Sequence, residues 1–175
     1  MNRFVLQIWN DETSRCTFYT VLKEGSDLSE ADKFFDRFGD EANPYVDSAY
    51  ELLELITTSI GDKYGATDDF FNRLEDRAQA LPPKPGRRIP EIGELGIHFP
   101  LRLFCYRICE SIVVLFNGGI KDTAAALDSV DLRSKFNDAQ MFSKIIERAI
   151  ADEIIVVAKE QRILIDFQGN HEINL

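Results

Sequence analysis

Two apolar runs in the middle of the chain are the strongest feature of its hydrophobic pattern. Residues 101–108 and 112–116 are rich in β-branched and aromatic residues, and each run has the length of a strand. Three residues separate the runs, and so short a polar gap predicts an antiparallel hairpin. The sequence Asn117-Gly118-Gly119 predicts a turn that ends the second strand, because adjacent glycines favour turns over strands.

Alternation along residues 101–108 separates two different faces. Successive side chains of a strand point to opposite sides, so one face carries Leu101, Leu103 and Cys105. The other face carries Arg102, Phe104 and Tyr106. The first set is typical of a core, whereas the second set places a cation between large apolar groups.

The N-terminal part of the chain predicts a strand pair and a short helix. Residues 3–9 and 16–22 are strand-like, and the polar stretch between them suits a loose hairpin. Ser29 then supplies an N-cap for a short helix that carries apolar residues at helical spacing and ends at Gly39.

Two further helices are predicted before the central runs. Asn43 as N-cap and Pro44 at the first helical position begin the clearest helix, which covers residues 44–60 and ends at Gly61. Its apolar residues recur with the helical period. Residues 67–81 show a similar spacing and predict another helix.

The segments on either side of the central runs are less regular. Residues 82–86 are rich in proline and predict a stiff connector, and residues 89–99 predict a strand interrupted by glycines. Residues 121–134 give no clear pattern, whereas residues 136–153 predict a helix. Residues 162–167 predict an edge strand, and we expect the last eight residues to be frayed.

This order of elements predicts one α+β domain over residues 1–175. Helices that are segregated from an antiparallel strand group are typical of a two-layer sandwich. We therefore expect a small antiparallel sheet that is packed on one face by helices. A chain of 175 residues is long enough to bury a sizeable core.

Composition and cysteine usage exclude several classes of protein. The longest apolar runs are far below the ~20 residues that span a bilayer, and no signal-like core is present at the N-terminus, so we expect a cytoplasmic protein without membrane contact. We interpret Cys16, Cys105 and Cys109 as reduced core thiols. Cys105 and Cys109 lack two further well-spaced ligands, which argues against a metal site, and nothing in the sequence indicates a cofactor.

The charge of the chain is unevenly distributed. A formal net charge of −10 argues against a general nucleic-acid binder, because phosphate contacts need clustered cations. Residues 82–121 nevertheless carry a local balance of +3, which leaves −13 for the rest. The cations of this basic middle are Lys84, Arg87, Arg88, Arg102, Arg107 and Lys121.

The central block resembles RelE/HigB-type toxins and their phage-derived relatives. The residues that carry the resemblance are Glu94-Leu95-Gly96, Leu101-Arg102-Leu103-Phe104-Cys105-Tyr106, Ile112-Val113-Val114-Leu115-Phe116 and Gly119-Ile120-Lys121. Such toxins show a strand arginine followed by aromatic residues, an aliphatic run, and a lysine after a glycine-containing turn. The resemblance is best over residues 90–121, and it leaves residues 154–175 as an additional C-terminal tail.

The resemblance implies a RelE-like fold and a metal-independent endoribonuclease that cuts mRNA on the ribosome and is silenced by an antitoxin protein. Arg102 and Lys121 match the basic residues of the family and would stabilise charge on the phosphoryl oxygens. Tyr106 would stack on a base or relay a proton. Arg87, Arg88 and Arg107 are the candidate RNA contacts through phosphate.

The residues themselves leave three hypotheses open. The first is the toxin-like ribonuclease, which the pairing of Arg102 with Lys121 favours. The second is a non-catalytic protein-binding module with the same fold, which the acidic composition and the lack of an evident general base favour. The third is an unrelated two-layer enzyme or adaptor. A half-buried structural arginine, a core-edge tyrosine and a turn lysine are the structural alternatives at these three positions.

Overall fold

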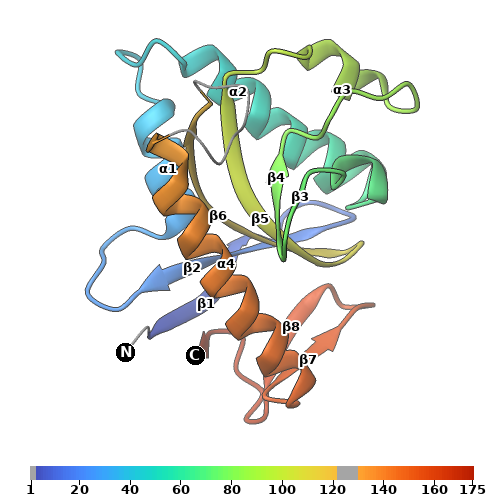
Figure 1. Ribbon diagram of the computed structural model, residues 1–175. Coiled ribbons are helices and arrows are strands. Elements are labelled where there is room, and N and C mark those ends of the chain that lie inside the picture. The colour runs from blue at the N-terminus through green and yellow to red at the C-terminus, as the bar shows by residue number, and fades with distance from the viewer. Residues whose placement is uncertain (1–2, 122–129) are drawn as a thin grey trace.

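The computed structural model describes residues 3–121 and 130–175 and shows a mixed, mostly antiparallel sheet with helices on both of its faces (Figure 1). The sheet has the strand order β3-β4-β5-β6-β2-β1-β9, and a separate two-stranded sheet is formed by β7 and β8. The α+β class expected from the sequence is thereby confirmed. The strands are β1 (Phe4–Asn10), β2 (Thr17–Lys23), β3 (Leu74–Glu75), β4 (Ala78–Leu81), β5 (Leu101–Cys109), β6 (Ile112–Ile120), β7 (Ile155–Ala158), β8 (Ile163–Asp166) and β9 (Ile173–Asn174).

The central hairpin is formed by β5 and β6, as the two apolar runs predict. These strands are antiparallel neighbours in the middle of the sheet, and Leu101 pairs with Ile120. The N-terminal strand pair is also confirmed, and β2 lies parallel to β6 on its other side. The predicted turn at residues 117–119 is wrong, because β6 continues through both glycines. A Cβ atom at Gly118 would collide with the backbone of Arg102, so glycine permits the close approach of the two strands.

The helices form two layers, one on each side of the sheet. One layer contains α1 (Glu30–Phe38), α2 (Val46–Glu54), the π-helix η1 (Leu55–Tyr64) and α3 (Pro90–Leu95). The other layer is α4 (Val130–Ala151), which crosses the opposite face of β5 and β6 (Figure 1). The helix predicted over residues 136–153 is therefore present, and it begins earlier in the chain.

The expectation that helices cover only one face of the sheet is wrong. Phe104, Val114 and Phe116 project toward α4 and are buried against Phe142 and other apolar residues of that helix. The opposite side chains of the same strands, such as Leu103 and Leu115, are buried in the other core. Both faces of the central hairpin are apolar, so the hydrophobic effect favours a helix on each.

Three local predictions differ from the structure. Residues 67–81 form the short 3-10 helix η2 (Asp68–Phe70) followed by β3 and β4, because pairing of β4 with β5 satisfies its backbone and buries its four residues. The stretch 89–99 holds the short helix α3 rather than a strand, with Pro90 in the first turn, where its missing N–H costs little. The helix predicted to end at Gly61 continues as η1 to Tyr64 and ends at Gly65, which has a φ of 80°.

The C-terminal segment is ordered rather than frayed. β9 extends the sheet beside β1, and the backbone groups of Phe4 and Leu175 exchange two hydrogen bonds of 3.0 and 2.9 Å. The strand predicted over residues 162–167 exists as β8, but it pairs with β7 away from the main sheet. Most of the patternless stretch 121–134 lies outside the described residues. None of the helices in the described part of the chain has the length and apolar character needed to cross a membrane.

Candidate functional site

Arg102 is a buried residue of the central strand. Its side chain lies on the α4 side of β5, opposite Gly119 of β6, and the residue is 1% exposed. The guanidinium Nη1 donates hydrogen bonds to the carbonyl oxygens of Phe99 at 2.9 Å and Leu101 at 2.8 Å. These contacts hold the segment that leads into β5. A group this deeply buried has no direct access to a phosphate in solvent.

Lys121 lies close to Arg102, at the end of β6. The backbone N–H of Lys121 donates to the carbonyl of Pro100 at 2.8 Å. Lys121 therefore lies at the end of the hairpin where β6 ends and β5 begins, next to Arg102. Burial lowers the pKa of the Lys121 ammonium, and the positive charges of Arg102 and Arg73 lower it further. Three cations are therefore close enough to interact.

Arg73 is a member of this cationic group that the sequence did not indicate. Its Nε donates to the carbonyl of Pro82 at 2.8 Å from the loop that precedes β3. The sequence predicts a helix over residues 67–81, and only the β-strand pairing of this region brings Arg73 toward the central hairpin. The group contains two guanidinium groups and one ammonium group.

Tyr106 is separated from this group although it shares a strand face with Arg102. It lies four residues further along β5, or about 13 Å at 3.3 Å per residue. Its side chain is half-buried and lines a hollow of about 340 Å³ together with Glu147 of α4 and Lys159 after β7. Burial raises the pKa of the Tyr106 phenol, and the charge of Glu147 adds to the rise. The predicted trio of Arg102, Lys121 and Tyr106 is not brought together.

Arg107 points to the other side of β5 and anchors a loop. Its Nη1 donates to the carbonyl of Ala66 at 2.9 Å, and its Nη2 donates to Asp68 Oδ1 at 2.6 Å. The guanidinium also lies over the ring of Phe71, 5.3 Å from the ring centre. These contacts give Arg107 a structural role between β5 and the segment that follows η1.

Arg87 and Arg88 lie in the loop between β4 and α3 and are both exposed. Arg88 Nε is 3.9 Å from Asp69 Oδ1, at the long limit of an ion pair, and its side chain is 85% exposed. The two residues are free to contact a polyanion in solvent. The burial of Arg102 prevents them from sharing one accessible phosphate site with it.

The cysteines are free thiols, and Cys16 and Cys105 are buried in the core. Burial raises the pKa of the Cys16 thiol to about 12 and also raises that of Cys105. Both groups are therefore protonated at neutral pH and poor nucleophiles. Within residues 3–121 and 130–175, no group of three or more His, Cys, Asp or Glu residues is arranged to hold a metal ion.

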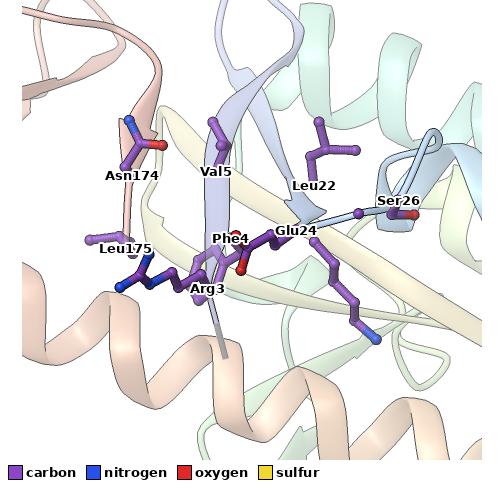
Figure 2. A pocket seen from close by; sticks show the side chains of 10 residues that line it. Arg3, Phe4, Val5, Leu22, Glu24, Ser26, Asn174 and Leu175 are labelled. Carbon is purple, nitrogen blue, oxygen red and sulfur yellow. The ribbon is translucent and has the colours of Figure 1, made fainter. Parts of the chain in front are cut away.

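A pocket of about 520 Å³ lies at the edge of the sheet (Figure 2). Figure 2 shows its lining side chains coming from β1, from the end of β2 and from the C-terminal segment. Most of the wall is apolar, and Lys23 is held by Asp138 at 2.8 Å and by Glu30 at 3.7 Å. The pocket therefore has room for a ligand, but its lysine is already engaged.

A second hollow, of about 490 Å³, lies between the α2–η1 helix and α3. We call it the acidic groove. Its floor includes Leu55, Ser59 and Leu95, its rim carries Glu51, Glu54 and Glu94, and Lys63 and Glu91 also line it. With four glutamates and one lysine among its lining residues, the groove has a local charge of −3. The sequence does not reveal the groove, because its residues come from two helices and the segment that forms α3 has the pattern of a strand.

Comparison with known proteins gave no match to a family model, to a curated protein or to a solved structure.

Proposed function

We propose that this protein is a non-catalytic relative of the RelE/HigB-type toxins that acts by binding another protein. The burial of Arg102 is the observation that carries the proposal. The resemblance gives Arg102 the main role in stabilising the phosphoryl transition state, and the guanidinium is instead 1% exposed and bonded to two backbone carbonyls.

Transition-state stabilisation requires donors within about 3 Å of the oxygens on which charge develops. Arg102 is 1% exposed, so its guanidinium does not lie on an open surface that could receive RNA. Tyr106 is too far along β5 to act at the same phosphate as Arg102 and Lys121. The candidate catalytic residues therefore do not form one accessible site.

The charge of the surface supports protein binding over RNA binding. The net charge of −10 repels a polyanion, and Arg107, one candidate RNA contact, is paired with Asp68. The acidic groove is a concave surface that suits a basic protein segment.

The ribonuclease remains the second candidate, because the charge of Arg102 acts on Lys121, and two neighbouring cations could bind one phosphate. Induced expression in a bacterial host, followed by mapping of mRNA ends in a translating extract, separates the two functions. We expect no growth arrest and no translation-dependent cleavage. Growth arrest with cleavage that is lost in Lys121→Gln would contradict the proposal and establish the enzyme.

A further inference from the structure

We infer that the acidic groove is the docking site for a basic, amphipathic segment of a partner protein. The inference rests on the proposed function, which requires a partner, and it specifies where the partner binds and by which chemistry.

Two helices supply the acidic rims of the groove. Glu51 and Glu54 are three residues apart on α2 and therefore lie on the same side of that helix. Glu91 and Glu94 are spaced in the same way on α3, which packs against η1. Carboxylates thus line both sides of a shared floor.

Among the residues that the structure describes, only Glu91 of these four carboxylates has a partner. Glu91 accepts a hydrogen bond from Lys63 Nζ at 2.7 Å and another from the Tyr64 hydroxyl at 3.0 Å. Lys63 accordingly lowers the pKa of Glu91. Glu51, Glu54 and Glu94 are exposed and form no ion pair with the residues that the structure describes. Basic groups of a partner would relieve the repulsion among these like charges.

The floor of the groove contains an unpartnered hydroxyl. Ser59 is 5% exposed, and its side chain makes no hydrogen bond to any residue of the described chain. The hydroxyl oxygen itself is not buried, so it is open to the groove, where it can bond to water or to a ligand group that enters. Ser59 lies within the π-helix η1, and π-helical segments occur frequently at functional sites.

The apolar part of the floor determines the kind of occupant. Leu55 and Leu95 provide a surface for an apolar side chain, and a small polycation would leave that surface uncovered. A second copy of this chain is disfavoured, because each copy carries a net charge of −10. An apolar residue flanked by Lys or Arg on a protein segment satisfies both the floor and the rims.

The test uses a synthetic amphipathic peptide of leucine and lysine, roughly 12 residues or about 18 Å long as a helix. Its binding to the full chain is measured by isothermal titration calorimetry. The groove variant Glu51→Lys/Glu54→Lys is compared with the control variant Glu160→Lys/Glu172→Lys, which changes the net charge equally at exposed positions elsewhere. Circular dichroism verifies that both variants are folded.

We expect the groove variant to lose roughly tenfold or more in affinity and the control variant to lose less than twofold, because only the first inverts the contacted rim. Equal losses would show attraction by net charge alone and overturn the inference. Equal binding of a scrambled peptide, or displacement of the peptide by spermine at the same concentration, would also overturn it.

These outcomes are distinct from failure of the proposed function. If wild-type protein neither arrests growth nor cleaves mRNA and the groove variant still binds the peptide normally, the groove assignment is wrong and the binding function stands. If wild-type protein cleaves mRNA during translation, the proposed function is wrong whatever the peptide does.

Discussion

Arg102 shows how the role of a single residue depends on what covers it. Alternation along β5 correctly placed it on the face opposite Leu101 and Leu103, and the sequence also placed it near Lys121. The residue is nevertheless buried, and on the same face of β5 the apolar side chains of α4 pack against Phe104. That cover could not be inferred from β5 alone, although the presence of Phe104 on the same face was a signal that this side is also core.

Gly118 of β6, which pairs with Leu103 next to Arg102, is equally constrained. We predict that Gly118→Ala lowers the free energy of unfolding by about 1–3 kcal/mol, because the new methyl group collides with the backbone of Arg102 and forces β5 and β6 apart. Denaturant unfolding measures the change. Gly86→Ala, where an added methyl group meets nothing, is the matched control and should be nearly neutral.

The titration of Lys121 reports on its cationic neighbours. We predict a pKa below 10.5 that rises in Arg73→Gln, because burial and the charges of Arg102 and Arg73 disfavour the ammonium form. Since the folded state releases this proton at lower pH, the contribution of Lys121 to stability increases as pH rises through its folded pKa toward 10.5. Side-chain NMR measures the pKa, and a value at or above 10.5 in wild type would refute the arrangement.

At the scale of elements, the sequence predicts the helices and strands that depend on contacts between residues close together in the chain. The helices near residues 44–60 and 136–153 and the strands of both hairpins follow from periodicity and caps. β4 did not follow, because the helical spacing of the apolar residues over 67–81 competes with a long-range pairing to β5 that the sequence does not reveal. The same limit applies to β9, whose two residues become a strand only beside β1.

The contribution of α4 to burying this face of the sheet can be tested by removing the ring of Phe142. Phe142 is 1% exposed, and its ring centre lies 5.0 Å from that of Phe4 and 5.5 Å from that of Phe116. We predict that Phe142→Ala costs about 3–5 kcal/mol in the free energy of unfolding, through lost burial and a cavity. Urea unfolding provides the measurement, with Val130→Ala on the same helix as an exposed control. A cost below about 1 kcal/mol would show that α4 does not seal this face.

At the scale of the whole molecule, the described residues form two cores on opposite sides of one sheet, and these cores bury both faces of the central hairpin over Leu101–Cys105 and Ile112–Phe116. This arrangement buries Arg102, the residue to which the resemblance gives the main catalytic role. The acidic groove forms instead on the outer side of one helical layer, from residues about 40 positions apart in the sequence. The sequence shows an excess of cations over residues 82–121, but only the folded structure shows that Arg102 among them is buried.

Thermal unfolding of Arg102→Ala is the most direct measurement of whether this arginine holds the fold together or serves catalysis. Loss of the two hydrogen bonds to Phe99 and Leu101, together with the cavity left behind, should cost about 3 kcal/mol and lower Tm by about 6–12 °C. Arg87→Ala, at an exposed loop position, should leave Tm within about 2 °C of wild type. The account would be contradicted if wild-type protein arrested growth and Arg102→Ala did not, while the Tm of the variant was unchanged. That result would assign Arg102 to catalysis.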